Sequence, residues 1–318
     1  MIYLPADQVR KHLTLEVAFE AVAEALTYVA NGSARVNPVV IAPGLHEGEV
    51  FSIKSGLIES GPIVGLKVGS YWPGNAALGL PRHASSVFLL DPATGRLSAV
   101  IEASELNGPR TAAADAVAAS VLARSDSKTL AILGAGHQAL HEVRALSAMR
   151  PIQRVLIASR TGESAQKLRA TLAAESPAVV EVVSAEVACR EADILVTVTP
   201  SRAPLFNSEW IRPGTHVATM GSDQAGKQEL PPELVRRARL FCDLPAQSTH
   251  IGEFQHVRAE IEAGTLRLTA VGDVLAGRSR GRETDSEITI FDSSGLAIQD
   301  LMVCARVVHL SQKAGSPV

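Results

Sequence analysis

Residues 129–143 read TLAILGAGHQALHEV, an apolar run that ends in a Gly-x-Gly-x-x-Ala pattern and continues as a helical pattern. Dinucleotide-binding motifs have this order, because the chain turns tightly at Gly134 and its backbone at Gly136 can approach a diphosphate. A small residue at Ala139 lets the helix pack closely on the strand, while the N–H groups of its first turn face the anion. The segment therefore predicts a dinucleotide site. The alternative is a glycine turn that binds nothing.

Alternating strand and helix patterns follow this motif. Helical patterns cover residues 137–149 and 163–173, and apolar strand-like segments lie at 154–158, 179–183, 192–199, 216–220, 240–243 and 288–291. Strands that alternate with helices predict a parallel sheet, and strands apolar on both faces are expected when helices cover both faces. The fold class expected here is α/β, with a Rossmann-type doubly wound sheet of about six strands.

The first part of the chain has a different pattern. An amphipathic helix is expected over residues 15–30, followed by strands at 36–42, 49–54, 63–70 and 85–90 and a hairpin turn at 91–95. Strands without helices between them indicate an antiparallel-rich α+β domain.

Two helices are expected to join the parts. An alanine-rich helix runs from about Asn107 to about Arg124, with Pro109 in its first turn, where a missing N–H costs little. A second helical segment, residues 295–308, follows the last strand of the sheet and is expected to return to the first domain. The predicted domains are residues 1–118 with 293–318, and residues 119–292.

Composition limits the partners. The chain has 318 residues, a formal net charge of -3 and no run of Lys or Arg, so nothing favours a nucleic acid or an anionic membrane surface. It has neither a signal-peptide pattern nor a long apolar span, and its three cysteines are widely spaced, which together indicate a cytoplasmic protein with buried thiols. No zinc-binding spacing is present, so no metal site is expected. Small molecules are the expected ligands.

The end of the second strand of the sheet bears on the cofactor. An NAD site usually has Asp or Glu there for the ribose hydroxyls, but this strand ends in Ser159, Arg160 and Thr161. Arg160 can pair with a 2′-phosphate or stack on adenine, and the two hydroxyls can donate hydrogen bonds. The sequence therefore favours NADP(H) over NAD(H). The alternative is that Arg160 is a solvated loop residue.

Three cations in the first part are candidates for binding an acid: Arg35, Lys67 and Arg110. Lys67 lies in an apolar strand, where a charge is costly without a partner. A substrate carboxylate could be that partner, assisted by the helix dipole near Arg110. The alternative for the two arginines is a structural or solvated role.

The segment from Met220 to Leu230 follows an apolar strand and contains Asp223 and Lys227. Such a loop lies at the carboxyl end of the sheet, where open α/β domains bind ligands. Asp223 could act as a general acid or base beside a nicotinamide, with Lys227 setting its charge or orientation. The alternative is a solvated turn.

Taken together, these segments resemble the ornithine cyclodeaminase and mu-crystallin family over nearly the whole chain. The residues that carry the resemblance are Ala34-Arg35-Val36, Lys67, Ser85 to Pro92, Arg110-Thr-Ala-Ala, Leu133 to Gln138, Thr197-Val-Thr199, Gly221 to Leu230 and Phe291 to Gly295. The resemblance implies a homodimer, whose split first domain carries the substrate pocket and the subunit interface around a Rossmann domain.

The resemblance also implies roles for single residues. Arg35, Lys67 and Arg110 would clamp the carboxylate of an amino acid or cyclic imino acid, with Ser86 where a threonine is common. Asp223, Lys67 and Lys227 would form the catalytic set, with Asp223 also contacting the substrate. The quoted motifs add further candidate cofactor contacts: His137, Gln138, Thr197, Thr199, Ser294 and Gly295.

Because the loop keeps Asp223 and Lys227, it is similar to the cyclodeaminase version of the family. That similarity favours conversion of ornithine to proline and ammonia, in which a hydride leaves the α-carbon and later returns. Asp223 would remove the proton from the δ-ammonium before the nitrogen attacks.

Two departures keep other functions open. Lys54 lies near the position of a cyclodeaminase glutamate and would repel an ornithine side chain, and residues 159–161 resemble the mu-crystallin type, which uses NADPH. One alternative is an NADPH-dependent reductase of a ketimine such as Δ1-pyrroline-2-carboxylate. The second is a non-enzymatic ligand-binding protein of the mu-crystallin kind.

Overall fold

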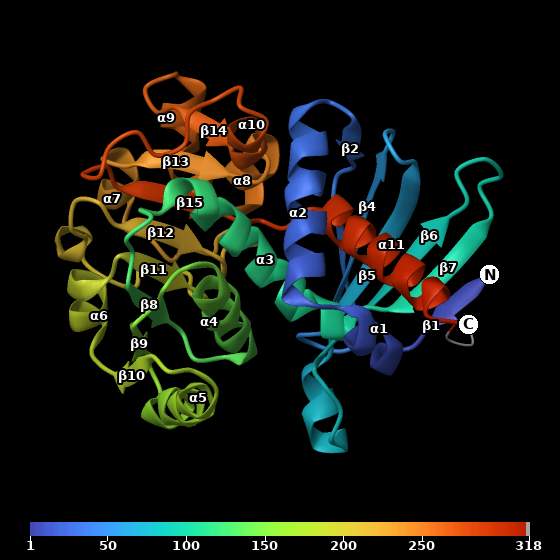
Figure 1. Ribbon diagram of the computed structural model, residues 1–318, viewed down its shortest axis with the longest axis horizontal. Coiled ribbons are helices and arrows are strands. Elements are labelled where there is room, and N and C mark those ends of the chain that lie inside the picture. The colour runs from blue at the N-terminus through green and yellow to red at the C-terminus, as the bar shows by residue number, and fades with distance from the viewer. Residues whose placement is uncertain (316–318) are drawn as a thin grey trace. The chain divides into compact units, whose positions relative to one another are not determined.

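The computed structural model describes residues 1–315 and separates into two compact units (Figure 1). Unit 1 contains residues 1–110 and the C-terminal segment from Leu296, and unit 2 contains residues 111–295. The boundary after Arg110 lies inside a continuous helix, residues 104–122.

Unit 1 is built on a seven-stranded sheet in the order β1-β7-β6-β5-β4-β2, with β3 also paired to β4. The strands are β1 (Ile2–Leu4), β2 (Ala34–Val36), β3 (Val40–Pro43), β4 (Val50–Ile58), β5 (Ile63–Tyr71), β6 (His83–Leu90) and β7 (Leu97–Glu102). Only β1 and β7 pair in parallel, so the prediction of an antiparallel-rich domain is confirmed. The single strand predicted over 36–42 is wrong: Pro38, which has no N–H for a ladder, separates β2 from β3.

The hairpin turn between β6 and β7 is confirmed. The Asp91 carboxylate accepts hydrogen bonds from the backbone N–H groups of Ala93 and Thr94, at 3.1 and 2.8 Å, and Gly95 adopts a φ of 68°. Asp and Gly occupy these positions because one caps the turn and the other tolerates left-handed backbone.

The C-terminal helix belongs to unit 1, as predicted. The helices of this unit are α1 (Ala6–His12), α2 (Leu15–Ala30), the 3-10 helix η1 (Pro73–Leu78) and α11 (Ala297–Lys313). Helix α11 lies across β4, β5 and β6 and packs beside α2 (Figure 1). Two glycines allow this approach, since a Cβ on Gly65 or Gly56 would lie 3.0 Å from Leu301 or 3.1 Å from Ile298.

Helix α3 (Ser104–Leu122) begins earlier than expected. The sequence placed Pro109 in the first turn, but the helix starts directly after β7 and has Pro109 in its interior. Pro109 has no N–H for the carbonyl four residues earlier, so that turn lacks one hydrogen bond. The earlier start brings Asn107 and Arg110 onto the helix.

Unit 2 is an eight-stranded parallel sheet in the order β10-β9-β8-β11-β12-β15-β13-β14. The strands are β8 (Thr129–Leu133), β9 (Arg154–Ala158), β10 (Val179–Val182), β11 (Ile194–Thr197), β12 (His216–Thr219), β13 (Arg239–Cys242), β14 (Leu268–Ala270) and β15 (Thr289–Asp292). The Rossmann-type prediction is confirmed. Strand β14 was not predicted, because three residues carry no periodicity.

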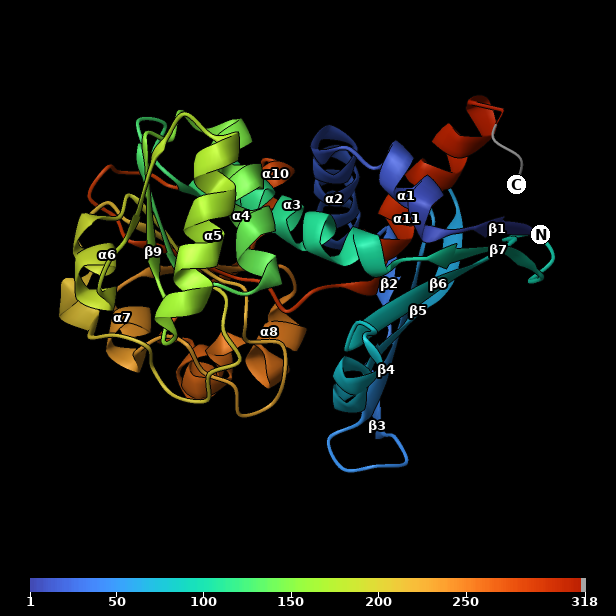
Figure 2. The ribbon, with the colours of Figure 1, turned by 90° about the horizontal axis from the view of Figure 1, so that it is seen from below.

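Helices cover both faces of this sheet. They are α4 (His137–Met149), α5 (Gly162–Glu175), α6 (Ala185–Glu191), α7 (Pro232–Arg236), α8 (Pro245–Ile251), α9 (Arg258–Glu262) and α10 (Val271–Leu275), with the 3-10 helices η2 (Ser208–Trp210) and η3 (Glu253–Val257). Leu156 packs in the core with residues of α6, α7 and η3, while its neighbours Val155 and Ile157 are equally buried on the other face. Figure 2 shows the same elements from below.

The three cysteines are buried free thiols, as the sequence indicated. Within residues 1–315, no helix has the length and apolar character needed to cross a bilayer.

Candidate functional site

The turn between β8 and α4 requires glycine at position 134. Gly134 has a φ of 118°, and a Cβ there would lie 2.6 Å from the carbonyl oxygen of Val198. Its own N–H donates to the Ala158 carbonyl at 2.9 Å, which fixes the turn against β9. Gly134 therefore serves both the left-handed backbone and the close approach of β11.

The second glycine of the motif borders open space. A Cβ on Gly136 would meet no heavy atom within 4 Å, and α4 begins immediately afterwards at His137. Ala139 is fully buried, as its packing role predicts. The first-turn N–H groups of a helix have no intrahelical acceptor, so this open turn fits the diphosphate of a dinucleotide.

The side chains at the start of α4 have partners within the helix. Gln138 donates to the Glu142 carboxylate at 2.7 Å, and the rings of His137 and His141 pack with centroids 4.7 Å apart. These side chains are therefore already engaged within α4.

The end of β9 is cationic and polar. Arg160 is exposed, Ser159 is half-buried, and the Thr161 hydroxyl is 2.8 Å from that of Ser164. The first carboxylate after the end of β9, that of Glu163, forms an ion pair with Lys167 at 2.7 Å. Arg160 therefore projects into solvent at the position where an NAD site usually has an acid.

Glu229 is a buried glutamate that contacts the ends of β11 and β12. No role was predicted for it from the sequence. The Glu229 carboxylate accepts hydrogen bonds from the hydroxyl of Thr197 at 2.9 Å, the hydroxyl and N–H of Thr199 at 2.8 and 2.7 Å, and the N–H of Gly221 at 2.9 Å. Burial raises the pKa of Glu229, while these donors oppose the rise. The two threonine hydroxyls that we predicted for the cofactor thus donate to Glu229.

Further buried carboxylates support the same edge of the sheet. Glu253 accepts from the N–H groups of Glu229 and Leu230, and burial raises the pKa of Glu253 to about 7. Asp243 accepts from the Ser294 hydroxyl at 2.8 Å and the Gly295 N–H at 2.7 Å. The predicted cofactor residues Ser294 and Gly295 are therefore held in place by Asp243.

Asp223 and Lys227 form an ion pair in the loop after β12. The Lys227 Nζ lies 2.6 Å from Asp223 Oδ1 and 3.2 Å from the Gly221 carbonyl oxygen. The Asp223 side chain is 56% exposed, so its carboxylate is accessible. A paired yet accessible carboxylate is suited to proton transfer.

In unit 1, Lys67 and Arg110 contact the same carboxylate oxygen. Lys67 Nζ and Arg110 Nε lie 2.9 and 3.0 Å from Asp300 Oδ1, and all three side chains are buried. Burial lowers the pKa of Lys67 to about 8, although Asp300 partly offsets this. Burial opposes ionisation of Asp300, but Arg110 and Lys67 bring its pKa below the ordinary value.

Neutral polar groups complete this cluster. Asn107 contacts Lys67 and donates to the Ser85 hydroxyl at 3.0 Å, and Arg110 donates to the Gln299 side-chain oxygen at 3.3 Å. The buried atoms Asp300 Oδ2 and Gln299 Nε2 have no hydrogen-bond partner among the described residues. Sequence reasoning missed Gln299 and Asp300, although adjacent polar residues in an apolar helix were a usable signal.

Two predicted substrate residues lie away from this cluster. Ser86 pairs with Val68 rather than Lys67, so strand alternation places it on the opposite face of the sheet. Arg35 pairs with Leu57, also on that opposite face, and its exposed guanidinium forms an ion pair with Glu59 at 3.0 Å. The structure brings Ser85, not Ser86, beside Asn107.

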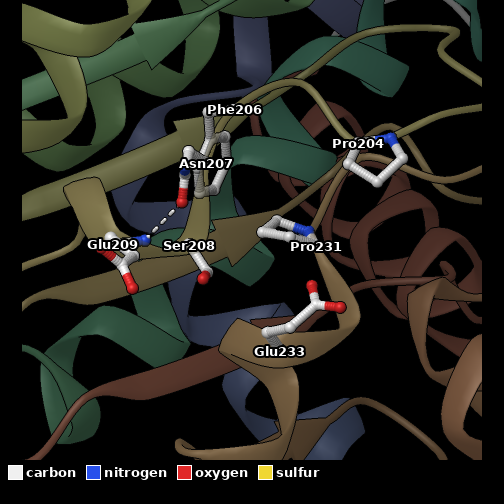
Figure 3. Close-up of a pocket in the computed structure, with 7 residues that line it drawn as sticks. All are labelled: Pro204, Phe206, Asn207, Ser208, Glu209, Pro231 and Glu233. Atoms are coloured by element: carbon white, nitrogen blue, oxygen red, sulfur yellow. Dashed lines mark hydrogen bonds between the residues drawn. The ribbon is translucent and has the colours of Figure 1, made fainter.

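A separate surface hollow lies in unit 2. Figure 3 shows its lining, and its volume is about 530 Å³. The seven lining residues are Pro204, Phe206, Asn207, Ser208, Glu209, Pro231 and Glu233. The set contains two carboxylates, no cation and none of the predicted site residues, so it is unsuited to an anionic dinucleotide.

The chain is similar to several proteins of known name. It is 40% identical to an iminosuccinate reductase from Paracoccus denitrificans, over 99% of this chain and 98% of that protein. The structure of that reductase in complex with NAD+ superposes with a TM-score of 0.93, over 99% of this chain and 97% of that one.

Two further relatives share the fold. An alanine dehydrogenase from Archaeoglobus fulgidus is 36% identical, over 100% of this chain and 98% of that protein. A Δ1-pyrroline-2-carboxylate reductase from Thermococcus litoralis, solved with NADH and L-proline, is 29% identical with a TM-score of 0.92, and all of each chain is covered.

Residues 2–316 match the family described as the ornithine cyclodeaminase/mu-crystallin family. The match spans both units and includes the glycine motif, the Lys67 strand and the Asp223 loop. The chain therefore belongs to the ornithine cyclodeaminase/mu-crystallin family.

Proposed function

We propose that this protein is a nicotinamide-dependent oxidoreductase that reduces the C=N bond of a small α-imino acid, giving the α-amino acid. The observation that carries the proposal is the buried pair of cations, Lys67 and Arg110, which shares one oxygen of Asp300. Two buried cations with one carboxylate retain a positive charge, which a substrate α-carboxylate would compensate.

The relatives support the same chemistry. The names iminosuccinate reductase, alanine dehydrogenase and Δ1-pyrroline-2-carboxylate reductase all denote a substrate whose carboxylate is attached to the carbon that bears nitrogen. The side chains of these substrates differ, so the chemistry that the relatives share extends only to the carbon that bears nitrogen and to its carboxylate.

The proposed cofactor is a nicotinamide dinucleotide, which would supply or accept the hydride. The open turn at Gly136 fits its diphosphate, and the relatives were solved with NAD+ or NADH. At the adenosine end we propose that Arg160, with Ser159 and Thr161, favours NADP(H) because no acid is present to bind the ribose hydroxyls.

The residues would have separate roles. Lys67 and Arg110 bind and orient the α-carboxylate, and Asp300 orients both cations. Asp223 exchanges the proton that the substrate nitrogen gains or loses, and Lys227 orients the Asp223 carboxylate. Glu229 positions the loop that carries Asp223.

Ornithine cyclodeaminase activity is the second candidate, and the Asp223–Lys227 pair favours it, because that reaction needs an acceptor for the δ-ammonium proton. Lys54 argues against it. Lys54 is paired with Lys67 across β4 and β5, so a second ammonium group would be repelled there. We therefore rank imine reduction first.

We further propose a homodimer. An archaeal alanine dehydrogenase that is 33% identical, with a TM-score of 0.93 over 100% of this chain and 98% of that one, was solved as a dimer with bound NAD. In unit 1, α2 and α11 lie on one face of the sheet (Figure 2), which leaves the other face for a second copy. Sedimentation velocity tests this proposal.

One set of assays tests the function. The purified protein is incubated with NADH or NADPH and, in turn, with pyruvate plus ammonium, oxaloacetate plus ammonium, and Δ1-pyrroline-2-carboxylate. Cofactor oxidation that depends on the acid supports imine reduction. Proline formed from ornithine with oxidised cofactor, without reduction of any imine, would support the cyclodeaminase. Ligand binding without turnover would support the binding-protein alternative.

A further inference from the structure

The loop that carries Asp223 and Lys227 contains a tight turn between these two residues. The Lys227 N–H donates to the Gln224 carbonyl oxygen at 3.1 Å, and of the two central residues only Gly226 has a positive φ, of 79°. This combination is a type II turn over residues 224–227. Because the turn joins the two members of the ion pair, its conformation sets the direction of the Asp223 carboxylate.

The side chain of Gln255, on η3, binds this turn at three backbone groups. Its Oε1 accepts from the Gly226 N–H at 2.7 Å, and its Nε2 donates to the carbonyl oxygens of Gln224 and Lys227, each at 3.3 Å. The Nε2 group also donates to the Gly252 carbonyl oxygen at 2.9 Å. An amide supplies an acceptor and donors at once, whereas an ionised carboxylate only accepts and a hydrocarbon does neither.

Two further residues of η3 hold the same loop. The His256 Nε2 lies 2.8 Å from the Lys227 carbonyl oxygen, so this nitrogen carries the proton of the hydrogen bond. Glu253 accepts hydrogen bonds from the N–H groups of residues 229 and 230, where the loop ends. The 3-10 helix therefore contacts the loop both at its turn and at its end.

These contacts leave the reactive group accessible. The Asp223 side chain is 56% exposed, and Gln255 contacts backbone groups of the loop rather than the Asp223 carboxylate. Proton transfer depends on the position of the acid, and a misplacement of about 1 Å can lower a rate by about a hundredfold. Solvent gives an exposed side chain no fixed geometry, so the backbone that carries Asp223 must supply it.

We propose that Gln255 positions the Asp223–Lys227 pair for proton exchange with the substrate nitrogen. This inference rests on the proposed function. Gln255 acts through the turn and is a positioning residue, because its contacts are with the backbone that carries Asp223. Its loss should therefore slow the proton step and leave the binding of the acid and of the cofactor unchanged.

The first test is Gln255→Met, which keeps the length of the side chain and removes its acceptor and donors. We expect kcat for imine reduction to fall about tenfold or more, while KM for the acid and for NADH changes little. The ratio of kcat in H2O to kcat in D2O should increase, because proton transfer becomes slower. Gln153→Met, at an exposed glutamine between α4 and β9, is the matched control. A lower kcat with an unchanged isotope ratio would indicate a role in stability alone and overturn the inference.

A second variant perturbs the turn from the loop itself. Alanine is strained at the φ of Gly226, and its Cβ would lie 2.9 Å from Nη1 of Arg202, so the turn should shift. We expect Gly226→Ala to lower kcat and raise the isotope ratio as Gln255→Met does. Gly264→Ala is the control, because Gly264 is also exposed, has a φ of 74° and has no heavy atom within 4 Å of an added Cβ.

Hydrogen–deuterium exchange of residues 221–230 separates this inference from the proposed function, because it needs no turnover. Faster exchange of these amides in Gln255→Met, in a protein that reduces no imino acid, would support the hold of Gln255 on the loop and refute the reductase. Wild-type kcat and isotope ratio in Gln255→Met, in a protein that does reduce an imino acid, would retain the reductase and refute the role of Gln255. Unchanged amide exchange would also refute it.

Discussion

Glu229 holds Thr199 through two hydrogen bonds to one carboxylate oxygen, from the N–H at 2.7 Å and from the hydroxyl at 2.8 Å. Its other oxygen accepts from the N–H of Gly221, which begins the loop that contains Asp223. One buried side chain thus connects the end of β11 to the proposed acid–base loop.

This connection predicts the effect of Glu229→Gln. An amide can present only one oxygen to these donors, and its NH2 group would face an N–H or hydroxyl, so we expect a loss of about 1–3 kcal/mol in the free energy of unfolding. Weaker NAD(P)H binding should accompany it. Denaturant titration and fluorescence titration of the cofactor measure the two effects. Glu209→Gln, at an exposed site, is the control, and equal behaviour of both variants would contradict the role of Glu229.

The two glycines of the cofactor turn should respond differently to alanine. Gly134→Ala places a Cβ against the Val198 carbonyl in left-handed backbone, so we expect a loss of about 1–3 kcal/mol of stability and no cofactor binding. Gly136→Ala meets no protein atom, so its melting temperature should match the wild type while NAD(P)H affinity falls. If the stable Gly136→Ala protein bound NAD(P)H with unchanged affinity, the proposal that the diphosphate binds at this turn would be wrong.

The strand–turn–helix unit around these glycines was predictable because its signals are local. The apolar run, the turn glycine and the small helical residue lie within residues 129–139. Strand β1 was missed because its partner, β7, lies far along the chain. The start of α3 was misplaced because proline near a helix start usually marks the first turn.

The substrate cluster was predictable only in part. Lys67 was identifiable as a charge in an apolar strand, but its partner Asp300 lies 233 residues away, and only the fold brings them together. The pairing of Lys54 with Lys67 depends on strand register, which the sequence did not fix. The same register separates Ser86 and Arg35 from the cluster.

The depressed pKa of Lys67 predicts how acid binding depends on pH. Lys67 has a pKa of about 8 and faces Asp300 and Cys304 on α11, Arg110 on α3 and Lys54 on β4. Above this pKa the free amine predominates and the protonated fraction of Lys67 falls tenfold per pH unit, so the affinity for a carboxylic acid such as succinate should fall by up to about tenfold per pH unit. Lys67→Arg should bind with little pH dependence between pH 7 and 9. A pH-independent wild type would contradict a charged Lys67 in the site.

Arg160→Ala tests the coenzyme proposal. If the exposed guanidinium pairs with a 2′-phosphate, its loss should raise KM for NADPH by about tenfold or more and change KM for NADH little. Arg169→Ala, an exposed arginine on α5, is the control. Equal changes in KM for both coenzymes would show that Arg160 does not bind the 2′-phosphate of NADPH.

Asp115 of α3 predicts a pH-dependent stability in unit 2. Its carboxyl is fully buried, and burial raises the pKa of Asp115 to about 7, with Glu142 of α4 partly opposing the rise. The folded protein holds this proton more tightly than the unfolded chain does. The contribution of Asp115 to the free energy of unfolding is therefore present in full below about pH 4 and is lost as the pH rises through 7. Asp115→Asn cannot ionise, so its free energy of unfolding relative to wild type should increase by about 2–4 kcal/mol between pH 5 and pH 8. Urea titrations at both pH values measure the difference, with Asp7→Asn as an exposed control. If the free energies of unfolding of Asp115→Asn and wild type differed by the same amount at both pH values, the raised pKa of Asp115 would be contradicted.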